Sequence, residues 1–73
     1  MIHLRVKEIA GQKGISMGKL SRVADVSYKT VKRIYDDPTY SATLPILERL
    51  AKALGVATAD LIEDVPDNAG RQS

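Results

Sequence analysis

Cysteine is absent from the 73-residue sequence, and histidine occurs once, as His3. Without cysteine the chain can form neither a disulfide nor a thiolate zinc site, and a single histidine cannot hold a metal ion by itself. The sequence also supplies no recognisable set of nucleophile, base and orienting group, and no pair of carboxylates that marks a catalytic pocket. The composition therefore predicts a protein that is not an enzyme and has no cofactor and no metal site.

Long hydrophobic runs are missing as well. Near the N-terminus Ile2, Leu4 and Val6 alternate with polar residues, which does not match the continuous apolar segment of a signal peptide. No stretch of the chain is long and apolar enough to cross a bilayer. Since the lack of cysteine also fits the cytoplasm, we expect a soluble, cytoplasmic protein with no membrane partner.

The length of 73 residues is enough for one domain and too short for two. A domain this small buries only about 60 % of the surface that its unfolded chain exposes, so we expect marginal stability. After Glu63 the chain is rich in Asp, Pro, Asn, Gly and Ser, which favours a frayed or disordered segment. The sequence thus predicts one domain over residues 1–63 and a flexible tail over 64–73.

Charge is distributed unevenly along the chain, although the net charge is only +2. Residues 1–35 include eight basic and two acidic side chains, a net charge of +6, whereas residues 36–73 include three basic and seven acidic side chains, a net charge of −4. Such polarisation lets one face attract a polyanion while the whole molecule stays nearly neutral. A solvated surface of mixed charge is the alternative explanation, and the charge pattern alone does not separate the two.

Apolar residues recur every three or four positions through most of the chain, which indicates helices. Capping residues, glycines and prolines divide this pattern into five expected helices, over residues 4–13, 16–24, 27–36, 43–54 and 58–62. The residues expected to face inward from the first four helices are Val6, Ile9 and Ala10; Leu20, Val23 and Ala24; Ser27, Thr30, Val31 and Ile34; and Leu44, Leu47, Leu50, Ala51 and Leu54. The predicted fold class is all-α.

Two short helices joined by a tight corner, the second of them basic, give residues 16–36 the outline of a helix-turn-helix. The outward arc of the second helix is expected to contain Tyr28, Lys29, Lys32, Arg33 and Asp36. Its three cations share one stripe, and the helix offers them no acidic partner before Asp36. An ordinary amphipathic helix can show the same stripe, but unpaired positive charge favours DNA binding. Asp36 and Asp37 oppose it, since they place negative charge at the negative end of the helix.

Several short motifs occur together in a recognisable order and spacing. They are KGIS at 13–16, Leu20, the corner AxVS at 24–27, TVKRI at 30–34, and LERLAKALGV at 47–56 followed by ADLI. On these motifs, residues 4–62 resemble the lambda-repressor-like, Cro/repressor-type helix-turn-helix family, also called the XRE family. The resemblance implies a compact five-helix bundle, binding of the third helix in the major groove of double-stranded DNA, and commonly a two-fold homodimer on a palindromic operator.

A few positions depart from the family pattern. Met17 stands where members usually have a glutamine that touches phosphate, and Asp25 stands at the corner where glycine is usual. A left-handed backbone is expected at that corner, and aspartate tolerates it better than most residues with a side chain. Tyr35 stands where glutamate is common, and Ala10 where the basic partner of that glutamate would be. A large and a small residue are expected to pack together there instead.

The resemblance also assigns roles to side chains of the motif. Base contacts are expected from Tyr28, Lys29 and Arg33, because lysine and arginine can donate to guanine O6 and N7. The residues expected to contact phosphate are Ser16, Met17, Lys19, Ser27, Thr30, Lys32, Tyr40 and Ser41. Each role has a plainer alternative, since exposed cations also keep a protein soluble, and Tyr28 can lean on Tyr35.

The predicted function is that of a transcription regulator, a repressor, that binds double-stranded DNA sequence-specifically as a homodimer. Ile46 and Ala53 lie beside the main apolar stripe of their helix, and with Ile62 and Val65 they are the expected dimer surface. Single exposed apolar residues are common and need no role, so this surface has a plain alternative. The alternative function is a protein-binding module of the same fold, such as an antitoxin or an adaptor.

Overall fold

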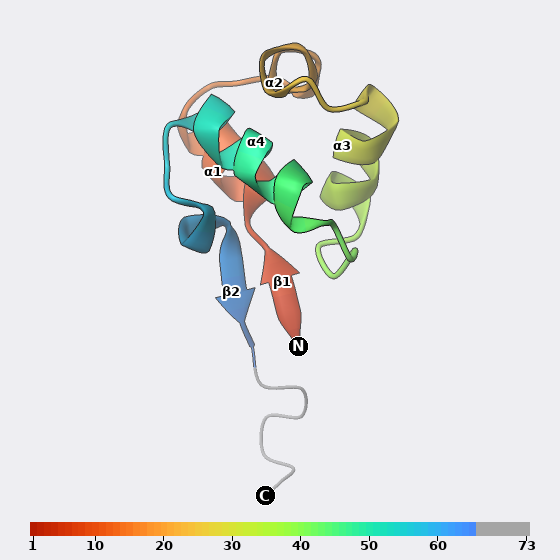
Figure 1. The fold of residues 1–73 in the computed structure, drawn as a ribbon, viewed down its shortest axis with the longest axis vertical. Coiled ribbons are helices and arrows are strands. Elements are labelled where there is room, and N and C mark those ends of the chain that lie inside the picture. The colour runs from red at the N-terminus through yellow and green to blue at the C-terminus, as the bar shows by residue number, and fades with distance from the viewer. Residues whose placement is uncertain (66–73) are drawn as a thin grey trace, which may run out of the picture.

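The computed structural model describes residues 1–65 of the chain. Their elements, in chain order, are β1 (Ile2–Leu4), α1 (Val6–Gln12), α2 (Met17–Ala24), α3 (Tyr28–Asp36), α4 (Leu44–Leu54), the 3-10 helix η1 (Thr58–Leu61) and β2 (Ile62–Asp64). The α-helices gather into one body, and β1 and β2 extend from it side by side (Figure 1). The predominantly helical fold expected from the sequence is confirmed. Within these residues no helix combines the length and the hydrophobicity that crossing a membrane requires.

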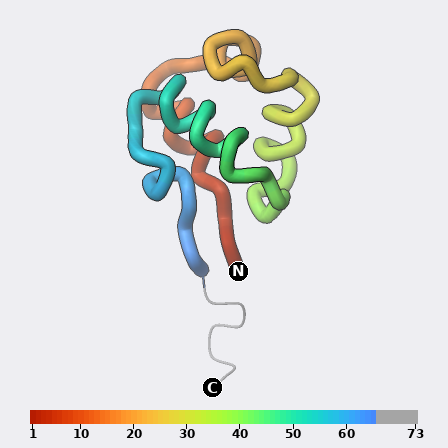
Figure 2. Tube along the Cα trace, in the orientation of Figure 1, coloured from red at the N-terminus to blue at the C-terminus, as the bar shows by residue number. Residues whose placement is uncertain are grey.

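The two strands correct the all-α, five-helix prediction. β1 pairs antiparallel with β2, with Ile2 opposite Asp64 and Leu4 opposite Ile62. The pairing brings the N-terminus beside the end of β2, as the tube in Figure 2 also shows. Period-two alternation in residues 1–7 is the pattern of a strand, but so short a strand is stable only when a partner and a packed face support it. That partner comes from the other end of the described chain.

The pairing also changes where the first helix begins. Two backbone amides ahead of α1 donate to distant carbonyls, Leu4 to Pro38 at 2.7 Å and Arg5 to Leu61 at 2.7 Å. Leu4 is paired with Ile62 in the sheet and Arg5 is the N-cap of α1, so α1 begins at Val6 rather than at Leu4. The expectation of a helix from residue 4 was therefore wrong, because it omitted the competing long-range backbone partners.

At the other end of the domain, the last helix is shorter than expected. The 3-10 helix η1 stops at Leu61, and Ile62, which was expected to be helical, lies in β2. Strand pairing then continues into the first two residues of the expected tail, because β2 includes Asp64 and the Val65 amide donates to the Met1 carbonyl at 2.8 Å. The rest of the expected tail, residues 66–73, lies outside the described residues.

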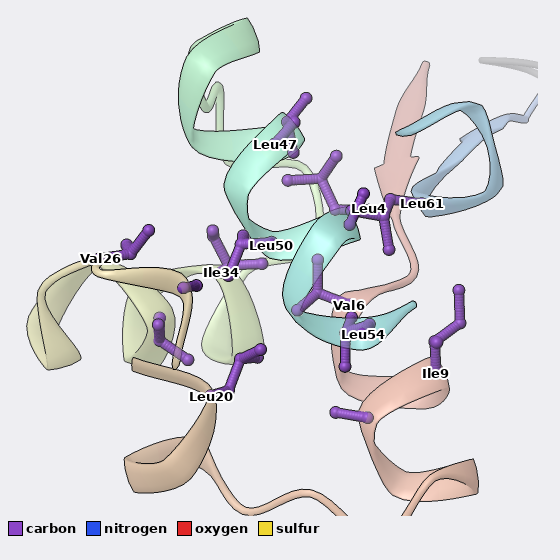
Figure 3. Packing of buried hydrophobic residues seen from close by; sticks show 14 residues of the cluster. Leu4, Val6, Ile9, Leu20, Val26, Ile34, Leu47, Leu50, Leu54 and Leu61 are labelled. Atoms are coloured by element: carbon purple, nitrogen blue, oxygen red, sulfur yellow. The ribbon is translucent and has the colours of Figure 1, made fainter. Parts of the chain in front are cut away.

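A single apolar core lies between the helices. α4 packs on α1, α2 and η1, while α3 packs on α1 and α2. Leu20, Ile34 and Leu50 enter the core from three different helices and point into the same space (Figure 3). The other buried residues are Leu4, Val6, Ile9, Ala10, Ala24, Val26, Val31, Leu47, Ala51, Leu54 and Leu61. No polar or charged residue among 1–65 is buried, so apolar burial holds the helices together.

Two residues expected to face inward are exposed instead. Val23 is 59 % exposed and Leu44 is 65 % exposed. The centre of the buried face of α2 runs between Leu20 and Ala24, and Val23 lies about 80° away from it at 100° per residue. Leu44 is the first residue of α4 and lies about 70° from the centre of that helix's buried face. The spacing of apolar residues therefore predicted a wider buried face on each of these two helices than the neighbouring helices cover.

Three helices end with the same backbone geometry. Gly14, Asp25 and Gly55 have φ values of 67°, 57° and 74°. In each case the amide of this residue and the amide of the next one donate to carbonyls of the last helical turn, which is the Schellman arrangement. Within residues 1–65, Asp25 is the one residue other than glycine with a positive φ. The left-handed corner expected from the sequence is confirmed.

The corner after α2 is held from two sides. The Val26 amide donates to the Ser21 carbonyl at 3.1 Å, and the Ser21 hydroxyl donates to the Val26 carbonyl at 2.6 Å. From α4, the Arg49 guanidinium donates to the Asp25 carbonyl at 3.4 Å. These bonds fix the direction in which the chain leaves α2, and hence where α3 begins.

Replacing Asp25 with glycine is expected to raise the free energy of unfolding by about 0.5–1 kcal/mol, because glycine adopts a positive φ without the steric cost of a Cβ atom. Thermal and urea melts of the two proteins measure the difference. Asp25→Asn is the matched control, since it removes the same charge and keeps the Cβ atom. An equal gain in both variants would assign the effect to charge rather than to the backbone.

Candidate nucleic-acid interface

Serine caps begin both helices of the helix-turn-helix. Ser16 Oγ accepts a hydrogen bond from the Lys19 amide at 3.2 Å where α2 starts. Ser27 Oγ accepts from the Thr30 amide at 3.1 Å and donates to Thr30 Oγ1 at 2.8 Å where α3 starts. Such caps satisfy amides that the helix itself leaves unpaired. Four residues expected to touch phosphate thus lie at helix N-termini, where the helix dipole attracts an anion. They are Ser16 and Lys19 at α2, and Ser27 and Thr30 at α3.

α3 has one buried face and one exposed face. Val31 and Ile34 are fully buried, while Thr30 is half-buried and Ser27 is exposed at the cap. The expected inward arc is therefore correct for its two apolar members, which lock the rotation of α3 against the core. Because this rotation is fixed, the opposite face of the helix is presented to solvent.

The exposed face of α3 carries its three cations. Lys29, Lys32 and Arg33, which we call the basic stripe, are all exposed, and they fall within about 100° of arc on the helix. Tyr28, at the start of the helix, is 50 % exposed. The structure therefore brings together the three residues expected to contact bases and adds Lys32 beside them.

One member of the basic stripe has an acidic partner. Lys32 Nζ lies 3.0 Å from Asp36 Oδ2, one helical turn further along α3. The hydrogen bond to Asp36 and the attraction of its charge raise the pKa of the Lys32 ammonium. The pair is exposed to water, where its net energy is small. Asp36 thus reduces the net positive charge near Lys32, while the Lys32 ammonium stays exposed to solvent.

The neighbouring Asp37 has a different role. Its carboxylate Oδ1 accepts hydrogen bonds from the Thr39 amide at 3.0 Å and from the Thr39 hydroxyl at 2.6 Å. These two bonds lower the pKa of Asp37, since they favour the charged carboxylate. The two aspartates that opposed DNA binding in the sequence are therefore engaged locally, one with a lysine and one with a turn.

Arg33 has an aromatic partner that the sequence did not reveal. Its guanidinium carbon lies 5.8 Å from the centre of the Tyr40 ring, which comes from the connection between α3 and α4. Tyr40 is half-buried and packs against the core. It was expected to contact phosphate, and the contact with Arg33 was missed because the two residues face each other only after the chain turns at residues 37–40.

The remaining predicted contact residues lie in mixed surroundings. Met17 is half-buried against the core, whereas Ser41 is exposed in the connection before α4. Tyr35 is half-buried, and burial raises the pKa of its hydroxyl. Tyr35 packs against the core, and Ala10 is buried within it; that the two side chains fill one space together stays a prediction. The contact roles of Met17 and Ser41 stay predictions.

An open hollow of about 500 Å³ lies beside β1 and α1 and is lined by His3, Leu4, Arg5, Lys7, Glu8, Gly11, Pro38 and Glu63. Two of its charges are already paired, because the Arg5 guanidinium donates to both carboxylate oxygens of Glu8, at 3.3 and 3.2 Å. None of the residues expected to contact DNA lines this hollow. The basic stripe and the hollow are therefore separate features of the surface.

The sequence of residues 5–67 matches the family model of the Cro/C1-type helix-turn-helix DNA-binding domain. The chain belongs to this family. Among solved structures, its fold is similar to the N-terminal DNA-binding domain of the master biofilm-regulator SinR from Bacillus subtilis, with a TM-score of 0.71 and 23 % identity over 82 % of this chain and 87 % of that one. No curated protein matches the sequence. The resemblance seen in the motifs is confirmed, and the Cro/C1-type domain is a DNA-binding helix-turn-helix.

In this Cro/C1-type domain, replacing Asp36 with asparagine is expected to tighten binding to a mixed-sequence duplex about two- to fivefold at low salt. The variant removes a negative charge and frees the Lys32 ammonium for phosphate. Fluorescence anisotropy with a labelled duplex measures the change. Asp37→Asn removes the same charge from a side chain that bonds Thr39 instead of a lysine, so its gain should be smaller. Equal gains would show that total charge, rather than the Lys32 pair, controls affinity.

Proposed function

We propose that this Cro/C1-type domain is a sequence-specific transcription regulator, acting as a repressor, that lays α3 in the major groove of double-stranded DNA. The observation that carries the proposal is the basic stripe. Three exposed cations share one face of a capped helix whose other face is locked into the core. A helix of this kind fits the width of the major groove, and its cations attract the phosphates on either side.

Different residues of the stripe are proposed to do different work. Arg33 and Lys29 lie one turn apart, and each can donate to O6 and N7 of a guanine, arginine through two N–H groups at once. Lys32 is engaged with Asp36 and is proposed to contact phosphate, which positions the helix without reading sequence. Tyr28 is proposed to contact the methyl group of a thymine or to donate to a phosphate.

A homodimer on a palindromic operator is part of the proposal. Two copies related by a two-fold axis would place their α3 helices in successive major grooves, with half-sites about 10–10.5 base pairs apart. Ile46, Ala53, Ile62 and Val65 are the proposed dimer surface; all four are half-buried within one chain, which leaves part of each side chain for a partner. The cytoplasmic location expected from the sequence stays a prediction.

A second candidate function is a protein-binding module, such as an antitoxin or an adaptor. One observation favours it: Val23 and Leu44 are large apolar side chains exposed on the surface, as docking residues often are. Both lie outside the basic stripe. The two functions therefore predict different sensitivities to salt.

For the wild-type chain, affinity for a mixed-sequence duplex is expected to fall steeply with salt. Contact with roughly six phosphates corresponds to a slope of about −5 in a plot of log K against log salt. Anisotropy titrations at four or five salt concentrations give this slope. A flat plot, or no binding at the lowest salt, would favour the protein-binding module over the DNA-binding function.

Arg33→Ala is expected to weaken binding to the preferred duplex by roughly 1–3 kcal/mol and to relax one base position, whereas Lys32→Ala weakens all duplexes alike. Selection of bound duplexes from a random pool, carried out with each variant, shows both effects and the symmetry of the site. Lys52→Ala is the matched control, since Lys52 is an exposed cation of α4 outside the basic stripe. Equal losses at all base positions for Arg33→Ala would contradict the base-reading role.

A further inference from the structure

Tyr40 and Arg33 form the one aromatic-cation contact found within residues 1–65, with 5.8 Å between the guanidinium carbon and the ring centre. We propose that Tyr40 is a positioning residue for sequence recognition: its ring orders the Arg33 guanidinium so that the N–H edge of that group is presented to a guanine. The inference rests on the proposed function and extends it, because it moves Tyr40 from contact with phosphate to control of a base-reading side chain.

The chemical nature of its partner decides how many hydrogen-bond donors of the Arg33 guanidinium stay available for DNA. A guanidinium is flat, with five N–H donors in its plane, and an aromatic ring attracts it without using those donors. A carboxylate partner would instead occupy them, as Asp36 occupies the ammonium of Lys32. Within residues 1–65 no carboxylate pairs with Arg33. The ring therefore restricts the side chain and leaves its donors available for a base edge.

The ring itself is held by the connection between α3 and α4. Asp37 accepts two hydrogen bonds from Thr39, and the Tyr40 amide donates to the Asp37 carbonyl at 2.9 Å. On the other side, the Ala42 amide donates to the Tyr40 carbonyl at 3.1 Å. With its backbone bonded to Asp37, the C-cap residue of α3, and to Ala42, and with its side chain packed on the core, Tyr40 is a platform held at the C-terminal end of α3.

An ordered Arg33 lowers the entropy lost when the domain binds DNA, because a long side chain otherwise has to give up its rotamers at that step. An exposed contact of this type corresponds to about a two- to fivefold change in affinity. The change is expected on the duplex that contains the guanine read by Arg33, and not on a mixed-sequence duplex. This selectivity separates ordering of Arg33 from a phosphate contact by the Tyr40 hydroxyl, which would act on every sequence.

The test compares Tyr40→Leu, which removes the ring and keeps an apolar side chain, with Tyr40→Phe, which removes the hydroxyl and keeps the ring. Each is made in the wild-type chain and in Arg33→Ala, and each is titrated with the selected duplex and with a mixed-sequence duplex. Tyr40→Leu is expected to lower affinity two- to fivefold on the selected duplex alone. Tyr40→Phe is expected to keep the wild-type affinity. In the Arg33→Ala background, neither substitution is expected to change affinity further.

A measurement without DNA keeps the test independent of binding and of stability. In the free protein, the side-chain N–H proton of Arg33 should show a ring-current shift in the NMR spectrum that is kept in Tyr40→Phe and lost in Tyr40→Leu. If Tyr40→Leu lowers the melting temperature so far that it cannot be titrated, Tyr40→Trp gives the complementary test. Its larger ring should hold Arg33 at least as well, so affinity for the selected duplex should be kept or rise, and a loss of affinity on that duplex would contradict the inference.

Several results would overturn the inference. Loss of affinity in Tyr40→Phe would mean that the Tyr40 hydroxyl contacts phosphate. Equal losses of affinity by Tyr40→Leu on both duplexes would mean that the ring supports the fold rather than Arg33. Tighter binding by Tyr40→Leu would mean that the ring withholds Arg33 from DNA. An absent ring-current shift would show that the Tyr40 ring does not order Arg33 in the free protein. If the wild-type chain binds no duplex, the proposed function fails instead. If the wild-type chain binds the selected duplex and Tyr40→Leu binds it with the same affinity, the positioning role alone is contradicted.

Discussion

The burial of one side of α3 is the constraint on which the interface depends. α3 spans Tyr28–Asp36, and a helix of that length is marginal in water unless packing stabilises it. Val31 and Ile34 supply that packing and are fully buried. Because the two residues lie three apart, they fix the rotation of the helix about its own axis as well as its place against α1 and α2. The orientation of the basic stripe follows from apolar contacts on the opposite face.

The three cations of that stripe are alike in the sequence and different in the structure. Lys32 is paired with Asp36 at 3.0 Å, Arg33 lies over the ring of Tyr40, and Lys29 has no ion-pair partner within residues 1–65. A paired ammonium suits a role in general attraction, because it offers little directional bonding. A guanidinium beside an aromatic ring keeps its N–H donors unpaired by a carboxylate, which suits a base edge. Equal formal charges thus have unequal surroundings, which is the basis for the different roles proposed for them.

The rest of the small domain is organised around keeping this interface in place. The left-handed Asp25 sets the angle between α2 and α3, and Arg49 supports the corner from α4 through the Asp25 carbonyl. At the far end, β1 and β2 join the first and last described residues. A domain of this size has little apolar surface to bury, so backbone bonds between distant segments are a substantial part of what holds its ends together.

The sequence alone determined the helical periodicity, the serine caps, the left-handed corner and the grouping of Lys29, Lys32 and Arg33, because each depends on residues within one or two helical turns. The strand over Ile2–Leu4 was not predicted, because so short an alternation forms a strand only with a partner, and that partner comes from the other end of the described chain. Tertiary structure decided what depends on distant segments: the pairing of Leu4 with Ile62, the exposure of Val23 and Leu44, and the meeting of Arg33 with Tyr40. The physical reason is that these features are set by where the chain returns in space, and that is fixed only once the common core has formed.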